Sequence, residues 1–129
     1  MELGNALNWF EIPVEDFDRA KKFYELIFNY QMPESTMGPA RMGFLLYDFK
    51  GGKVGGAIVY NPKFYSPSPN GSLIYLNCQP DLQVVLYKVE AAGGKVLTEK
   101  TLISPEQNLG FWALISDSEG NRIALHSMG

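Results

Sequence analysis

The chain has 129 residues, of which 46% are hydrophobic and 19% are charged, and its formal net charge is −3. This length and composition predict a single globular domain, residues 1–129, with a core of its own. The acidic balance argues against nucleic acid as a partner, because phosphate binding needs a basic surface. No apolar run approaches the roughly 20 residues that cross a bilayer, and the lone cysteine, Cys78, cannot form an internal disulfide. We therefore expect a cytoplasmic protein without membrane contact.

The first half of the sequence predicts a strand, a helix and a hairpin. Polarity alternates along residues 7–14, which places Trp9 and Glu11 on one face of a strand. Asp16 is a good helix N-cap, and apolar residues then recur at helical spacing as far as Ile27. The expected elements are a strand at 7–14, a helix at 16–27, a loop over 30–41 with room for a short strand, and strands at 42–48 and 53–60.

The same order of elements returns after a linker at 61–71, which holds three prolines and a glycine. Gly93 is well placed to end the second helix in a left-handed conformation. The expected elements are a strand at 72–78, a helix at 81–92, and strands near 95–99, at 110–116 and at 121–127.

The two halves also repeat each other in sequence. Asp-Phe-Lys-Gly-Gly-Lys at 48–53 returns 69 residues later as Asp-Ser-Glu-Gly-Asn-Arg at 117–122, and each follows an apolar run. An internal repeat of this kind indicates two copies of one structural unit. The resulting prediction is a pair of pseudo-repeats, residues 5–60 and 72–129, in which 44–59 is equivalent to 113–128.

Two segments carry a family resemblance. Val-Glu-Asp-Phe-Asp-Arg-Ala-Lys-Lys-Phe-Tyr at 14–24 and Asp-Ser-Glu-Gly-Asn-Arg-Ile-Ala-Leu-His at 117–126 resemble the vicinal oxygen chelate superfamily of glyoxalases, bleomycin resistance proteins and extradiol dioxygenases. The details resemble small bacterial proteins related to lactoylglutathione lyase. The resemblance implies an α+β fold in which two tandem βαβββ modules form a curved, cavity-enclosing sheet. It also implies a homodimer that binds a small molecule.

The resemblance implies four positions for metal ligands, and none of them carries a suitable side chain here. Zinc, iron and manganese bind His, Cys or carboxylate groups. We therefore expect no metal and no cofactor, and the missing ligands argue against glyoxalase I activity. The four positions fall on Trp9, on Gly55 or Ala57, on Leu73 or Ile74, and on Ala124.

Strand alternation predicts which residues face the cavity instead. Glu11 and His126 are the candidate catalytic residues, because a carboxylate can orient an imidazole for proton transfer. Trp9, Glu11, Tyr75, Asn77 and His126 are expected to line one pocket, and an apolar, aromatic-walled cavity with a few polar groups is typical of a small-molecule site. The candidate substrate-binding residues are Trp9, Tyr75, Asn77 and Trp112.

Three functions remain open from the sequence. The first is a metal-free binding cavity for a small, partly aromatic molecule. The second is a metal-independent lyase or isomerase that uses Glu11 and His126 on a carbonyl substrate. The third is a metal enzyme with displaced ligands. An aromatic cluster of Tyr60, Phe64 and Tyr65 is expected to form a lid or a dimer contact, or to cover the sheet.

Overall fold

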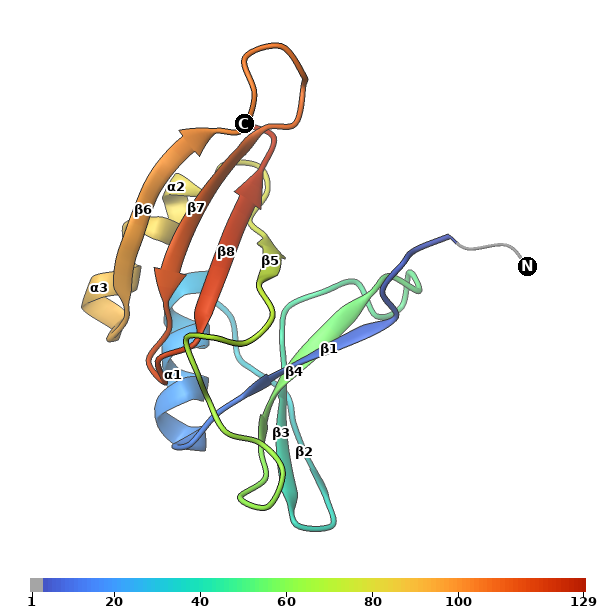
Figure 1. The fold of residues 1–129 in the computed structure, drawn as a ribbon. Coiled ribbons are helices and arrows are strands. Elements are labelled where there is room, and N and C mark those ends of the chain that lie inside the picture. The colour runs from blue at the N-terminus through green and yellow to red at the C-terminus, as the bar shows by residue number, and fades with distance from the viewer. Residues whose placement is uncertain (1–3) are drawn as a thin grey trace.

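The computed structural model describes residues 4–129, which form two four-stranded sheets and three helices (Figure 1). The first sheet has the strand order β1-β4-β3-β2 and the second the order β5-β8-β7-β6. The sheets do not close into a barrel, and the predicted α+β fold of two βαβββ modules is confirmed. The elements are β1 (Trp9–Pro13), α1 (Phe17–Phe28), β2 (Glu34–Met37), β3 (Ala40–Phe44), β4 (Gly55–Tyr60), β5 (Ile74–Asn77), α2 (Gln83–Leu86), α3 (Val89–Ala92), β6 (Lys95–Leu102), β7 (Phe111–Ser116) and β8 (Arg122–Ser127).

The two sheets are built in the same way. The first strand of each module lies at the edge of its sheet and runs parallel to the last strand of that module. Trp9 pairs with Gly55 in the first sheet, and Ile74 pairs with Ile123 in the second. Both β1 and β5 therefore keep one row of backbone hydrogen-bonding groups that no other strand of the described chain covers.

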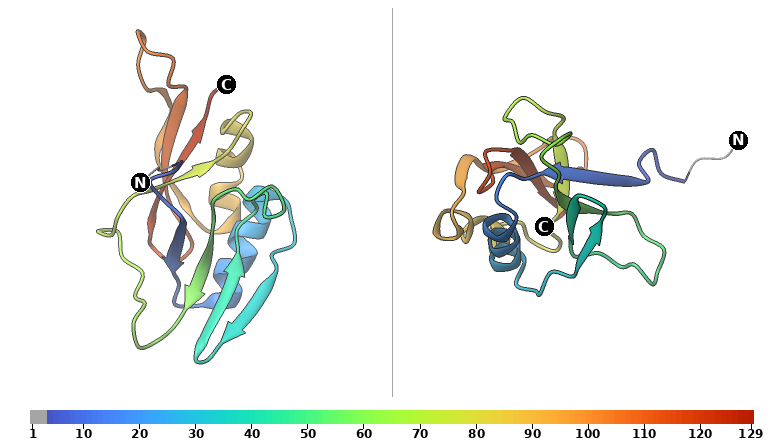
Figure 2. Two further views of the ribbon diagram at one scale, coloured as in Figure 1. Left: turned by 90° about the vertical axis from the view of Figure 1, so that its right-hand side faces the viewer. Right: turned by 90° about the horizontal axis from the view of Figure 1, so that it is seen from below.

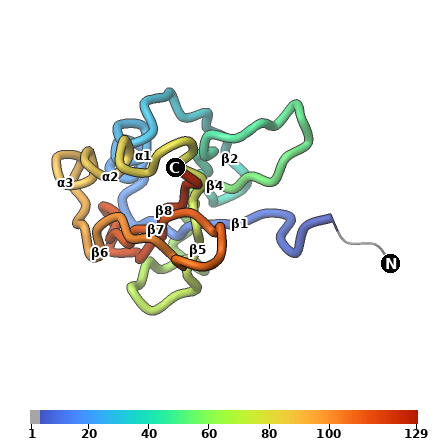
Figure 3. Tube along the Cα trace, turned by 90° about the horizontal axis from the view of Figure 1, so that it is seen from above, coloured from blue at the N-terminus to red at the C-terminus, as the bar shows by residue number. Residues whose placement is uncertain are grey.

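Helix α1 lies between the modules and supplies much of the shared core. The Asp16 side chain accepts a hydrogen bond from the Arg19 amide at 3.1 Å, which caps the helix as the sequence predicted. The buried face of α1 contacts β4 as well as α2 and α3, so both halves pack on one helix (Figures 2 and 3). The buried face consists of Phe17, Ala20, Phe23, Tyr24 and Ile27.

The second module departs from the predicted single helix at 81–92. Two short helices, α2 and α3, replace it. The Lys88 amide bonds the Val85 carbonyl at 3.1 Å, and this i to i+3 bond tightens the backbone between the two helices. Gly93 ends α3 with a positive φ of 110°, as predicted. No helix in residues 4–129 is long and apolar enough to cross a membrane.

The two Asp-containing hairpins are equivalent in design but not in role. The Lys53 amide bonds the Asp48 carbonyl at 3.1 Å, and the Asp117 amide bonds the Asn121 carbonyl at 2.9 Å. Residues 49–52 lie between the first pair and only 118–120 between the second. The repeat spacing is therefore 69 residues before the turn and 68 residues after it. This corrects the predicted match of 44–59 with 113–128, because the residues after the first turn match positions one residue earlier than predicted.

The second hairpin joins the two modules through a buried polar network. Asp117 is 3% exposed, and its carboxylate accepts a hydrogen bond at 2.7 Å from the hydroxyl of Tyr24, which is fully buried on α1. The Asn121 side chain donates to the Pro13 carbonyl at 2.8 Å and to Asp117 at 3.1 Å. Burial, and then the Asp117 carboxylate, raise the pKa of Tyr24, so its hydroxyl keeps its proton.

Glu119, in the same hairpin, caps α1 from the other module. One carboxylate oxygen accepts the amides of Glu15 and Asp16 at 3.0 and 2.8 Å, and the other accepts Arg19 Nε at 2.7 Å. Burial pushes the pKa of Glu119 upward, but the hydrogen bonds from Arg19, from Ser118 and from the two backbone amides outweigh it. They hold the pKa below its ordinary value of 4.5.

Glu119 should make stability depend on pH. A carboxyl group whose pKa is lowered by folding stabilises the protein above pH 4.5, and that contribution is lost as pH falls through the folded-state pKa. Urea unfolding at pH 7 and pH 3 should show a smaller loss for Glu119→Gln than for the wild type. Glu106→Gln, an exposed control, should keep the wild-type loss. An equal loss in all three proteins would contradict this role for Glu119.

Candidate functional site

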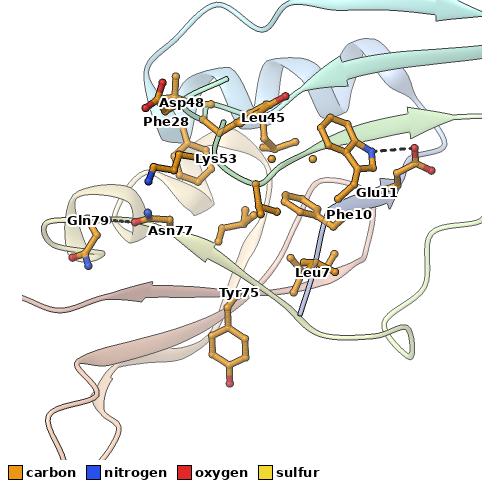
Figure 4. Close-up of a pocket in the computed structure, with 18 of the residues that line it drawn as sticks. Leu7, Phe10, Glu11, Phe28, Leu45, Asp48, Lys53, Tyr75, Asn77 and Gln79 are labelled. Atoms are coloured by element: carbon orange, nitrogen blue, oxygen red, sulfur yellow. Dashed lines mark hydrogen bonds between the residues drawn. The ribbon is translucent and has the colours of Figure 1, made fainter. Parts of the chain in front are cut away.

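A cavity of about 930 Å³ lies where the edge strand of each sheet meets the first hairpin (Figure 4). Trp9 and Glu11 reach it from β1, and Tyr75 and Asn77 reach it from β5. Most of the remaining wall is apolar, as in many small-molecule sites. The apolar lining includes Leu7, Phe10, Phe28, Leu45, Val54, Leu73, Ile74 and Leu76.

Glu11 is the half-buried carboxylate of this cavity. It accepts a short hydrogen bond from the Tyr65 hydroxyl and a longer one, 3.4 Å, from the Trp9 indole nitrogen. The bond to Glu11 raises the pKa of Tyr65, so the hydroxyl stays a donor at neutral pH. The aromatic linker thus folds back on the first sheet and fixes the Glu11 side chain through Tyr65.

Aromatic rings cover the face of the first sheet around Glu11. The Trp9 ring meets Phe44 and Tyr47 edge to face, with centroids 6.1 and 6.0 Å apart. Gly55 makes room for this arrangement, because a Cβ there would lie 2.3 Å from the Tyr47 ring. The space that a side chain at position 55 would enter is filled by an aromatic ring.

The opposite end of the cavity is polar. Asp48, Lys53, Asn77 and Gln79 gather there, across the cavity from Glu11 (Figure 4). The Asp48 carboxylate bonds the Gly51 amide at 2.8 Å, and the Asn77 side chain bonds the Gln79 amide at 3.0 Å. A ligand that fills the cavity therefore meets a carboxylate among aromatic rings at one end, and a carboxylate, an ammonium group and two amides at the other.

The other predicted site residues share a face of the second sheet. Asn77 pairs with His126, and His126 pairs with Trp112, so their side chains project to the same side. His126 Nε2 lies 2.8 Å from the Leu109 carbonyl oxygen, and neither His126 nor Trp112 lines the cavity. Tyr75 is 54% exposed, and its ring points away from Glu11 (Figure 4).

Within one chain the structure thus brings Trp9, Glu11, Tyr75 and Asn77 to one cavity and leaves Glu11 unpaired with His126. Tyr65 and Tyr47 are the functional candidates that alternation along strands missed. Tyr65 belonged to an aromatic cluster visible in the linker, but its carboxylate partner lies 54 residues away in sequence.

The cavity does not fit the metal that the family resemblance of the sequence implies. Two of the implied ligand positions, Gly55 and Ala124, are buried in strand-to-strand contact, and a third, Trp9, carries an indole. Among residues 4–129, no group of three or more His, Cys, Asp or Glu side chains is arranged to hold a metal ion. Burial raises the pKa of the Cys78 thiol to about 12, so it is not a thiolate ligand at neutral pH.

Fold and cavity together define an α+β protein of paired βαβββ modules with a pocket beside the edge strands. Residues 6–125 match the Glyoxalase/Bleomycin resistance protein/Dioxygenase superfamily, and the chain belongs to this family. No curated protein matches the sequence.

Solved structures share the fold at low sequence identity. A hypothetical protein from S. aureus is 19% identical with a TM-score of 0.67, covering 95% of this chain and 94% of its own. A glyoxalase I mutant from Zea mays is 17% identical with a TM-score of 0.70, and 93% of this chain spans 46% of that one. The fosfomycin resistance protein FosX from Listeria monocytogenes is 16% identical with a TM-score of 0.61, covering 98% and 92%.

Proposed function

We propose that this glyoxalase-like protein binds a small, partly aromatic molecule in a metal-free cavity. The observation that carries the proposal is the aromatic cluster of Trp9, Phe44 and Tyr47. A ring of this cluster fills the space at Gly55, where the family resemblance implies a side chain that binds a metal. Aromatic rings beside a fixed carboxylate favour a ligand with a flat apolar part that contacts the rings and a polar group that the carboxylate can bind.

We further propose that a second copy of the chain completes the site. The open face of the first sheet carries Trp9 and Glu11, and the open face of the second carries Tyr75 and His126, yet the Tyr75 ring points away from Glu11 within one chain. A two-fold dimer would place the second face of one copy over the first face of the other, and would do so twice. It would also cover the unpaired edges of β1 and β5.

Titration calorimetry with 2-naphthol, a neutral flat aromatic probe, tests the binding function. The wild-type protein should bind it equally well before and after dialysis against EDTA. Trp9→Leu keeps apolar bulk but removes the stacking ring, and it should weaken binding about tenfold. Binding that disappears with EDTA and returns with zinc would overturn the metal-free proposal.

Mixing two weakened variants tests the shared site. Trp9→Leu damages the first face and Tyr75→Ala damages the second, so either variant alone should bind poorly. After unfolding and refolding together, half of the dimers carry one intact composite site, and roughly a quarter of the sites should regain wild-type affinity. Dimers that regain no sites, or a protein that light scattering shows to be only monomeric, would contradict the shared site.

The second candidate function is metal-independent proton transfer on a carbonyl substrate. The same dimer would bring His126, with its neighbours Asn77 and Trp112, toward Glu11 of the other copy, and this arrangement favours the alternative. Glu11→Gln should then abolish turnover with little change in substrate binding. Loss of binding without a measurable reaction in the wild type would instead support the binding function.

A further inference from the structure

In the part of the chain that the structure describes, the Glu11 carboxylate has hydrogen-bond donors but no positive partner. Its two donors, the Tyr65 hydroxyl and the Trp9 indole, are neutral groups. Within residues 4–129, no Lys, Arg or His nitrogen lies within 4.0 Å of Glu11. No cation of the described chain therefore offsets the Glu11 carboxylate, which lies in a half-buried, largely apolar setting where a cation is held more strongly than in water.

Aromatic rings also lie beside Glu11. Trp9 contacts Phe44 and Tyr47 edge to face, and Tyr65 packs on the same small cluster. Aromatic faces attract cations through the ring quadrupole, and Trp and Tyr do so best. Proteins bind organic ammonium groups at sites of this kind, in which a carboxylate lies among three or four aromatic rings.

We propose that the ligand of this cavity carries an organic cation, a substituted or quaternary ammonium group, which lies against Trp9 beside Glu11. The inference rests on the proposed binding function and names its ligand class. The ammonium group gains attraction from the Glu11 carboxylate and from the rings, whereas a neutral group of the same shape gains only its apolar contact.

The far end of the cavity sets the orientation of the ligand. Lys53 lies there with Asp48, Asn77 and Gln79, and it makes no ion pair within the described chain. The opposite charges of Lys53 and Asp48 offset each other, so this end favours a neutral polar group such as a carbonyl or a hydroxyl. The ligand is thus expected to place its ammonium group at Glu11 and a neutral polar group at the far end.

Two probes of the same shape isolate the charge. 3-(Trimethylammonio)phenol is a permanent cation, and 3-tert-butylphenol is its neutral isostere. By titration calorimetry at low salt, the wild type should bind the cation at least about fivefold more tightly. Glu11→Gln keeps an acceptor for Tyr65 but loses the charge, and it should weaken the cation about tenfold and the neutral probe less than twofold.

Glu106→Gln is the matched control, because it removes one exposed negative charge that does not line the cavity. It should bind both probes as the wild type does. Equal wild-type affinity for the two probes, or an equal loss of both in Glu11→Gln, would overturn the cation inference while the binding function stands. Failure of the wild type to bind either probe would overturn both.

Discussion

Replacing Asp117 with alanine should lower the free energy of unfolding by about 3 kcal/mol or more, because it orphans several buried donors at once. The Asp117 carboxylate accepts the Tyr24 hydroxyl, the Glu119 and Asn121 amides and the Asn121 side chain. Tyr24 is fully buried, so solvent does not replace the acceptor that its hydroxyl loses. Urea denaturation monitored by circular dichroism measures the loss.

The repeat itself supplies the control for this experiment. Asp48 occupies the equivalent place in the first hairpin, but it is exposed, and among residues 4–129 its side chain bonds only the Gly51 amide. Asp48→Ala should therefore cost less than about 1 kcal/mol. Similar losses at Asp48 and Asp117 would show that the buried network does not hold the modules together.

Replacing Phe23 with alanine should cost about 3 to 5 kcal/mol, because it opens a cavity in the core shared by both modules. Phe23 is fully buried on α1, and its ring meets Tyr24 edge to face at 4.9 Å. A Cβ added at Gly94 would lie 2.7 Å from the Phe23 ring, so the ring packs directly on the second module. The variant should therefore unfold both halves together.

Leu26→Ala on the exposed side of the same helix is the control for Phe23→Ala. Leu26 is 48% exposed, so truncation there should change the free energy of unfolding by less than about 1 kcal/mol. Differential scanning calorimetry compares the two variants. Two separate transitions in Phe23→Ala, with one module still at the wild-type temperature, would contradict a shared core.

The sequence was sufficient to predict the fold because its signals are local and repeated. Asp16 caps α1, the apolar face of α1 is buried, and Gly93 ends α3, each as its own residue type requires. The helix at 81–92 was predicted wrongly as one element. Its apolar spacing is helical throughout, and only the i to i+3 bond at Lys88, a detail of backbone geometry, divides it.

The site was less predictable, because its geometry depends on contacts between distant segments. Alternation placed Trp9 and Glu11 on one face, but it contains no information about Tyr65, which reaches Glu11 across 54 residues. Alternation also gives the face of a side chain within its own sheet and not the angle between two sheets. Within one chain the Tyr75 ring therefore points away from Glu11, and His126 does not line the cavity.

The hairpins of the two modules have different roles. The hairpin at 117–121 is hydrogen-bonded to α1 and to Pro13, so substitution of its buried residues is expected to destabilise both modules. The hairpin at 48–53 borders the cavity with exposed residues and makes no side-chain bond to the second module within residues 4–129. Mutational libraries meant to change what the protein recognises should therefore be concentrated at Asp48 and Lys53, the two exposed hairpin residues that line the cavity.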